Sequence, residues 1–134
     1  MLLNPKKFKY NKVKKGKLKK YNYKTISLKF GVIGLKALES GILTSKNIEA
    51  SRQAINRKIK RKGKLWLRIF PHTPLTNKSL GSRMGKGKGS FKLCYTKVST
   101  GSLIFEICGI NKKLALKAFK TGSAKLPVRT IIVT

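Results

Sequence analysis

The chain has 134 residues, and its 33 Lys and Arg against 3 acidic residues give it a formal net charge of +30. This length predicts one domain, and the charge predicts a polyanionic partner, above all nucleic acid, because binding relieves self-repulsion and releases counterions. With no Asp, and with isolated Glu at positions 39, 49 and 106, paired carboxylates for acid–base catalysis or for Mg²⁺ are nearly excluded.

Residues 1–23 contain nine Lys and no acidic residue. Like charges at this density resist collapse, so we predict an extended basic tail that becomes ordered against phosphates. Aromatic rings lie between the lysines and can either stack on unpaired bases or pin the tail to its own domain. A targeting peptide is not expected, because the segment has no Arg and an early Pro5. The rings of the tail are Phe8, Tyr10, Tyr21 and Tyr23.

The segment after the tail predicts two strands. In residues 24–30 apolar Ile26, Leu28 and Phe30 alternate with polar residues, as in a half-buried strand. Residues 32–38 form a second short strand, and Gly41 marks a turn.

A helix is predicted over residues 45–61, with Thr44 as N-cap and Gly63 as the C′ residue. Isoleucines at helical spacing would pack on a sheet, and basic residues cover much of the remaining surface. That basic face predicts nucleic-acid contact, because almost nothing acidic could pair with it. A solvated face, or for the last two residues an interaction with the helix dipole, is the alternative. The basic residues in question are Arg52, Arg57, Lys60 and Arg61.

Residues 64–70 predict a strand, and the loop that follows, residues 71–90, is long enough to suggest a function. Its core alternates Gly with Lys, so it cannot pack a hydrophobic core, and each Gly allows close approach to another molecule. We predict a basic finger extending from a sheet, with a disordered linker as the alternative. The spacing is not that of a nucleotide-binding P-loop. The sequence of this core is Arg83-Met84-Gly85-Lys86-Gly87-Lys88-Gly89.

The C-terminal third predicts a hairpin of strands 91–98 and 103–108, a helix over 112–121 and a strand over 128–133. Asn111 would cap the helix, with Leu114, Ala115, Ala118 and Phe119 facing inward. Cys94 and Cys108 could face each other across the hairpin; we predict buried thiols, with a disulfide as the alternative. No repeat or second domain is found, so residues 24–134 are predicted to form a single domain.

Candidates for other chemistry are few. His72 is the only histidine and lies between two prolines, where a turn residue is expected rather than a base or metal ligand. No Ser-His-Asp triad can be assembled without Asp, and the Cys and His spacing fits no zinc site. No apolar run approaches the ~18–20 residues of a membrane-spanning helix. We therefore predict no catalysis, cofactor, metal, membrane or small-molecule substrate.

Besides the glycine-lysine loop, short motifs run through most of the chain. They are Met1-Leu2, Pro5-Lys6, Phe30-Gly31, Gly34-Leu35-Lys36-Ala37, Leu43-Thr44, Ile48-Glu49-Ala50, Gly63-Lys64, Phe70-Pro71, Ala118-Phe119 and Ala124-Lys125-Leu126-Pro127, together with Arg52, Ala54, Arg57, Lys60-Arg61, Trp66 and Arg68. In the order and spacing of these motifs, the chain resembles the bacterial and organellar large-subunit ribosomal protein family called L-sixteen. The resemblance covers about 130 residues and is strongest in the glycine-lysine loop.

The resemblance implies an α+β fold, a two-layer sandwich of a mixed β-sheet with two α-helices. It implies a structural protein of the large ribosomal subunit that binds large-subunit rRNA beside the corridor for aminoacyl-tRNA. It also implies tRNA and neighbouring ribosomal proteins as partners, with Arg83 to Gly89 contacting rRNA or tRNA. The expected rRNA-binding residues are Lys6, Lys7, Lys9, Lys12, Lys14, Lys15, Lys17, Lys19, Lys20, Arg52, Arg57, Lys60, Arg61 and Arg68.

Two features depart from the family pattern. The tail carries Lys where Arg is usual. The second helix starts with Lys112-Lys113 where acidic residues are usual, and this start of the helix suggests extra RNA or an acidic protein nearby.

Lys outnumbers Arg 27 to 6, and the abundance of residues with A/T-rich codons suggests an organelle genome, mitochondrial rather than plastid, with a bacterium as a further alternative. An organelle gene would also explain the missing presequence. A free nucleoid or RNA-chaperone protein is the alternative function, and an RNA enzyme the third.

Overall fold

A computed structural model of the chain describes residues 3–18, 20–23 and 26–134. It has an α+β fold with two helices, which confirms the predicted class. Instead of one mixed sheet, the named strands form two antiparallel sheets, with orders β3-β6-β1-β7 and β2-β5-β4. The elements are β1 (Ile33–Ala37), β2 (Gly41–Thr44), α1 (Ser45–Lys58), β3 (Lys64–Leu67), β4 (Thr73–Asn77), β5 (Ser90–Val98), β6 (Leu103–Cys108), α2 (Lys112–Ser123) and β7 (Thr130–Val133).

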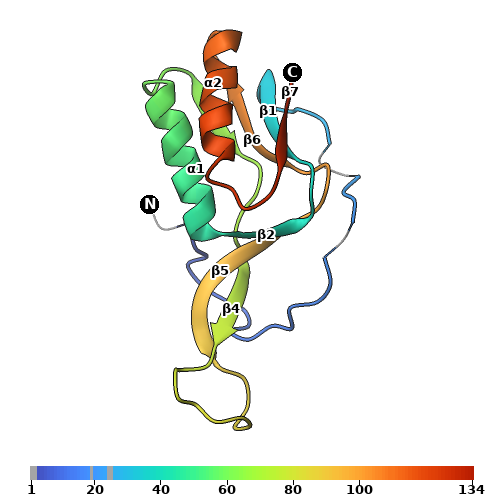
Figure 1. Cartoon of the computed structure of the whole chain (residues 1–134), viewed down its shortest axis with the longest axis vertical. Coiled ribbons are helices and arrows are strands. Elements are labelled where there is room, and N and C mark those ends of the chain that lie inside the picture. Colours follow the sequence, from blue (N-terminus) through green and yellow to red (C-terminus); the bar gives the residue numbers. More distant parts are fainter. Residues whose placement is uncertain (1–2, 19, 24–25) are drawn as a thin grey trace.

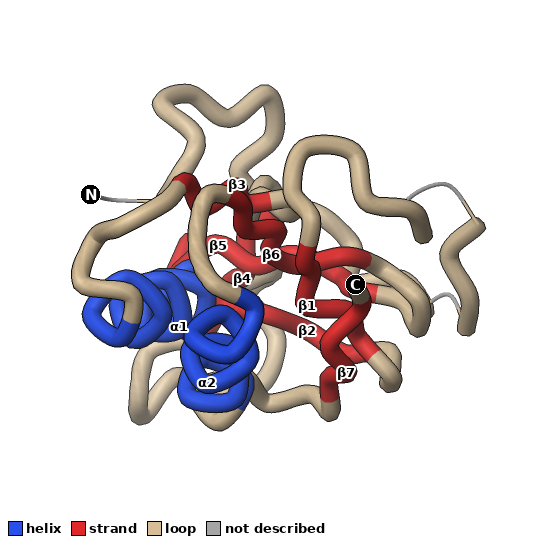
Figure 2. Tube along the Cα trace, turned by 90° about the horizontal axis from the view of Figure 1, so that it is seen from above, coloured by secondary structure: helices blue, strands red, loops and turns tan. Residues whose placement is uncertain are grey.

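The two helices pack against each other and lie on the same side of the strands (Figure 2). They pack tightly at Gly122, where a Cβ would lie 2.5 Å from Cγ1 of Ile55. There the buried Ser51 hydroxyl donates to the Gly122 carbonyl over 2.9 Å. The helices cover a core that includes Leu35, Phe105 and Phe119, all fully buried.

Helix α1 starts as predicted and ends earlier than predicted. The Thr44 side chain accepts from the Asn47 N–H, and the Asn47 side chain accepts from the Thr44 N–H, a capping box that fixes the start. The helix stops at Lys58 because Lys60 and Arg61 adopt left-handed φ angles of 52° and 59°. The predicted C′ glycine, Gly63, therefore lies beyond the true helix end.

Helix α2 and strands β1 and β7 of the first sheet follow local sequence signals. Asn111 caps α2 by accepting from the Lys113 N–H, and Ala115, Ala118 and Phe119 are buried as predicted, whereas Leu114 is only partly buried. Strand β1 lies inside the predicted 32–38, and β7 forms the second half of the predicted 128–133. The polar cap and the apolar spacing were sufficient to place these elements.

The predicted hairpin of β5 and β6 is wrong, although both strands exist. Strand β6 pairs with β1 and β3 in the first sheet, whereas β5 pairs with β2 and β4 in the second. Alternation of apolar residues identifies a strand without specifying its partner. Cys94 and Cys108 are both free thiols, as predicted, but Cys94 is buried and Cys108 only partly buried, so the predicted burial is confirmed for Cys94 alone.

Strand boundaries differ from the prediction at three further places. Strand β4 lies inside the predicted loop 71–90, because Pro74 occupies an edge strand, where a missing N–H is tolerated. Gly41 begins β2 and does not make a turn; a Cβ there would collide with Val128. Strand β3 ends at Leu67, three residues before the predicted end.

Residues 26–30 do not form the predicted strand; Lys24 and Thr25, which belong to the same prediction, lie outside the described residues. The N–H groups of Lys29, Phe30 and Gly31 all donate to one carboxylate oxygen of Glu106, at 3.2, 2.7 and 2.8 Å. Because successive N–H groups of a strand point in opposite directions, three that converge on one atom are incompatible with extended pairing. A distant anion therefore sets the conformation of this segment.

Candidate nucleic-acid interface

A two-stranded ribbon of β4 and the first half of β5 carries the glycine-lysine loop away from the helices (Figure 1). Along β5 the burial changes from exposed at residues 90–92 to buried at residues 94–96, so the strand leaves the core as it approaches the loop. We call β4, residues 78–89 and residues 90–93 the basic arm. The predicted finger thus exists, and an antiparallel strand pair with a register shift between Leu75 and Thr76 supports it.

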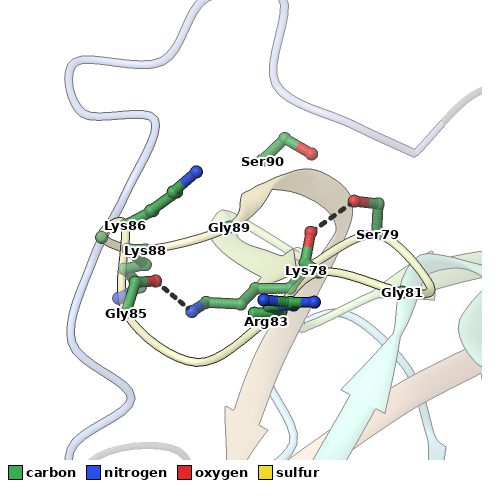
Figure 3. Close-up of a pocket in the computed structure, with 11 residues that line it drawn as sticks. Lys78, Ser79, Gly81, Arg83, Gly85, Lys86, Lys88, Gly89 and Ser90 are labelled. Carbon is green, nitrogen blue, oxygen red and sulfur yellow. Dashed lines mark hydrogen bonds between the residues drawn. The ribbon is translucent and has the colours of Figure 1, made fainter.

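The loop at the tip of the arm is open and cationic. Lys78 spans it, donating to the Gly85 carbonyl over 2.6 Å, and encloses a depression of about 450 Å³ (Figure 3). Gly85, Lys86 and Gly87 have consecutive positive φ angles of 88°, 52° and 77°, a conformation for which glycine is favoured. The side chains of Arg83, Met84, Lys86 and Lys88 are exposed, as an interface with an external partner requires.

The tail runs beside the arm (Figure 1). Phe8 packs on Phe91 of the arm, with ring centroids 5.3 Å apart. Two reciprocal hydrogen bonds join the segments: Lys12 donates to the Lys88 carbonyl over 2.8 Å, and Lys88 donates to the Val13 carbonyl over 2.5 Å. Tail and arm therefore present one continuous surface of positive charge, and like charges this close favour a bound anion.

Of the tail aromatic residues that the structure describes, Phe8 alone packs on another ring, and Lys9 lies over the ring of Tyr10, with Nζ 5.6 Å from its centroid. Tyr10, Tyr21 and Tyr23 are 64%, 62% and 82% exposed. One ring therefore pins the tail, as one alternative held, and the three tyrosines remain open to a partner. The predicted phosphate-binding lysines that the structure describes are all exposed, and Lys19 lies outside the described residues; the described ones are Lys6, Lys7, Lys9, Lys12, Lys14, Lys15, Lys17 and Lys20.

The basic face of α1 borders a depression of about 540 Å³. Arg52 is partly engaged, because its guanidinium binds both carboxylate oxygens of Glu49, at 2.9 and 2.6 Å, so the expectation that no acid could pair with this face is wrong for Arg52. The hydrogen bond from Arg52 is the main reason why the pKa of Glu49 is lowered. The remaining cations are exposed. The depression is lined by Arg52, Gln53, Asn56, Arg57, Lys60 and Arg61.

Backbone strain coincides with the predicted contacts. Among the described residues, the non-glycine positions with positive φ are Lys60, Arg61 and Lys86, all of them cations. A left-handed conformation costs a non-glycine residue about 1–3 kcal/mol. At these three positions the chain therefore has a cationic residue although glycine would adopt the same backbone conformation at a lower energy.

Replacing Lys60 by Gly should raise the free energy of unfolding by up to about 1 kcal/mol, because relief of strain exceeds the entropy that glycine adds to the unfolded chain. The same change should lower the salt dependence of RNA binding by about one phosphate contact. Urea unfolding and filter binding at several salt concentrations measure the two effects. In the control Lys58→Gly, the same charge is lost from the last residue of α1, where the backbone is helical, and stability should fall, by at most about 1 kcal/mol. Equal destabilisation by both variants would contradict the strain argument.

Arg68 has a different environment from the other predicted contacts. Its guanidinium is ion-paired with Glu106, and the side chains of the two residues are only 9% and 0% exposed. Burial by itself would raise the pKa of the Glu106 carboxyl, but the N–H groups of Gly31, Phe30 and Lys29 and the Arg68 charge outweigh it, so the pKa lies below 4.5. We therefore assign Arg68 a structural role. Glu106 was missed because it was taken as isolated; a lone acid in an apolar strand was the available signal.

The described residues contain no group of three or more His, Cys, Asp or Glu side chains that could hold a metal ion. His72 is exposed, with its Nδ1 3.1 Å from the Phe70 carbonyl oxygen. In the part of the chain that the structure describes, neither helix has the length and apolarity needed to cross a bilayer. What stands out chemically is positive charge displayed on an arm, a tail and a helix face.

This combination defines a small nucleic-acid-binding protein of the α+β class. Residues 5–133 match the family described as Ribosomal protein L16p/L10e, and the chain belongs to this family of ribosomal proteins, which are not enzymes. Proteins called Large ribosomal subunit protein uL16 are similar to it over 133 residues, or 99% of this chain. Those from Acinetobacter baylyi, Blochmanniella pennsylvanica and Buchnera aphidicola are 44%, 45% and 47% identical, with 97%, 98% and 97% of their own lengths covered.

Proposed function

We propose that the protein is a structural constituent of the large ribosomal subunit and binds large-subunit rRNA through its arm, tail and helix face. The observation that carries this proposal is the joining of arm and tail by Lys12 and Lys88 into one cationic surface. RNA phosphates would neutralise this surface. Family membership and the names of the bacterial relatives support the same assignment. The residues that we propose to contact rRNA are the tail lysines, together with Arg52, Arg57, Lys60 and Arg61.

We further propose that the tip of the arm helps to position tRNA beside the peptidyl-transferase centre. Arg83, Lys86 and Lys88 would contact tRNA or rRNA backbone, and the glycines between them permit close approach. Support comes from the exposure of these side chains and from the distance that the β4–β5 ribbon puts between them and the core.

Sedimentation tests the assignment. A tagged copy of the chain should migrate with large subunits and with whole ribosomes in a sucrose gradient, and should remain there in salt that strips loosely bound basic proteins. The second candidate, a free nucleoid or RNA-chaperone protein, is favoured only by the net charge of +30, which would attract any nucleic acid. It predicts a tagged protein in the DNA or light RNA fractions, and that result would overturn the ribosomal assignment.

For the location, we propose a mitochondrial ribosome and a gene in an A/T-rich organelle genome, with a plastid or a bacterial cytoplasm as alternatives. The excess of 27 Lys over 6 Arg supports this proposal. The relatives described above are bacterial. Sequencing the genome that carries the gene distinguishes the three cases, because the neighbouring genes identify the compartment.

A further inference from the structure

Two aromatic rings lie together outside the proposed interface, where the segment before β1 crosses β3. Phe30 and Trp66 are nearly parallel, with an interplanar angle of 22° and ring centroids 6.2 Å apart. Phe30 remains 57% exposed. Exposure of one ring alone needs no partner, but an exposed ring beside a second ring and rimmed by charged residues is the kind of surface that marks an interaction site.

The exposed ring is held firmly. The Phe30 N–H donates to Glu106 over 2.7 Å, and the Arg68 guanidinium lies over the ring, 5.1 Å from its centroid. Arg68 is itself fixed by its ion pair with the fully buried Glu106. Glu106 thus acts as a positioning residue that orients both the backbone and the cation beside Phe30. A ring ordered in advance loses little conformational entropy when it binds.

The charges around the rings indicate the chemistry of the partner. Lys64 lies over Trp66, with Nζ 5.3 Å from the ring centroid, and Lys64 and Lys29 are both exposed. The acid in this neighbourhood, Glu106, is buried and already paired. Aromatic rings between cations suit a ligand that offers a flat π surface and a negative backbone at once, which is an unpaired nucleotide.

We propose that Phe30 and Trp66 form a stacking platform for an unpaired base of RNA, with Lys64 placed for the adjoining phosphate. The proposal rests on the ribosomal assignment for its ligand class and adds a base-stacking subsite to it. A protein surface that docks on the same rings is the competing outcome of the test.

Trp66 is the only tryptophan of the chain, so its fluorescence reports on this site directly. The full-length protein is titrated with an octamer of riboadenylate and with an abasic octamer of the same charge. We expect the octaadenylate to quench Trp66 emission and to bind on the order of tenfold more tightly, because stacking depends on the base and phosphate contact does not. Equal affinity and equal emission with both probes would overturn the proposal.

Variants of Phe30 locate the effect. Phe30→Leu should remove most of the preference for octaadenylate, whereas Phe30→Tyr, which keeps the ring, should retain it. Phe70→Leu is the matched control: it removes another exposed ring, 47% exposed, that lies outside the arm, the tail and the platform, and should leave the preference for octaadenylate unchanged. A response that survives Phe30→Leu would refute the platform. If Phe30→Leu fails to fold, the comparison of the two octamers on the wild-type protein still decides, because equal emission and equal affinity with both would refute the platform.

The outcomes separate this proposal from the ribosomal one. If the wild-type protein sediments with large subunits but shows no base preference, the assignment stands and the platform is refuted. If Phe30→Leu keeps its response to octaadenylate yet leaves the large subunit, the rings dock a protein. If the base preference is present and the protein is found off the ribosome, the platform stands and the ribosomal assignment fails.

Discussion

Glu106→Gln should lower the free energy of unfolding by about 3–5 kcal/mol, the range for breaking a buried ion pair on one side. Glutamine keeps the shape of the side chain but replaces one oxygen by an NH₂ group, while four donors point at the original carboxylate: three backbone N–H groups and the guanidinium of Arg68. Arg68 would be left nearly buried without a counter-charge. Since small domains are stable by about 5–15 kcal/mol, a large part of the total would be lost. Urea unfolding followed by Trp66 fluorescence measures the change.

The exposed ion pair of Arg129 with Glu39 provides the control. Its Nε–Oε1 distance is 3.3 Å and its side chains are 84% and 50% exposed, so Glu39→Gln should change stability by less than about 1 kcal/mol. The double variant Glu106→Gln/Arg68→Met removes the stranded charge and should recover part of the loss. A Glu106→Gln protein as stable as the Glu39→Gln protein would show that the buried pair does not hold the segment before β1.

The same carboxylate makes stability depend on pH with a definite sign. The folded-state pKa of Glu106 is lowered below 4.5, so its contribution is present above about pH 4.5 and is lost as the pH falls through the folded-state pKa. Unfolding free energy should therefore decline on acidification below about pH 4.5. Glu106→Gln should flatten that decline, leaving mainly the smaller part due to Glu49, whose pKa is also lowered by the hydrogen bond from Arg52.

Replacing Arg83, Lys86 and Lys88 together by Ala should impair translation roughly tenfold while leaving the fold nearly as stable as before. Small misplacement of reacting groups can cost a factor of this size or more. The three side chains are exposed at the tip of the arm, and among the described residues only Lys88 of the three donates a side-chain hydrogen bond, to Val13. Large subunits assembled with the variant can be assayed for synthesis of polyphenylalanine, and the isolated protein for thermal unfolding.

A matched variant separates position from net charge. Replacing Lys117, Lys120 and Lys125 by Ala removes the same three charges from the exposed surface of α2 and of the turn that follows it. Translation should suffer much less from this change than from the change in the arm. If the arm variant instead lost stability and activity in parallel, its cations would be structural, and the proposed contact with tRNA would be wrong.

Local signals in the sequence predicted the elements whose ends are fixed locally. Thr44 and Asn111 placed the starts of both helices, because a side chain that caps a helix acts within three residues of itself. The end of α1 was misjudged because Gly63 looked like the natural stop, whereas Lys60 and Arg61 adopt the left-handed conformation. Having Lys60 and Arg61 at these positions, and not glycine, adds two positive charges beside the basic face of α1, and helix-propensity rules do not account for such an effect.

Pairing between distant segments could not be predicted. Nothing within residues 91–108 states that β5 and β6 join different sheets, since each has the alternation of an ordinary strand. The loss of the strand at 26–30 depends on Glu106, more than 70 positions away. For the candidate site, composition and the glycine-lysine loop predicted the charged surfaces. The contact of the tail with the arm and the ion pair of Arg68 with Glu106 join residues far apart in the sequence, so local patterns could not predict them.

The length of the β4–β5 ribbon sets how far the glycine-lysine loop lies from the core. A strand advances about 3.4 Å per residue and turns its side chains over at every step. Lengthening both β4 and β5 by two residues would shift the cations of the tip outward by about 7 Å and keep each side chain facing the same way; lengthening by one would reverse them all. Changes in reach are therefore available only in steps of two residues, so the stem length of an arm of this kind records the separation between the scaffold and the molecule it touches.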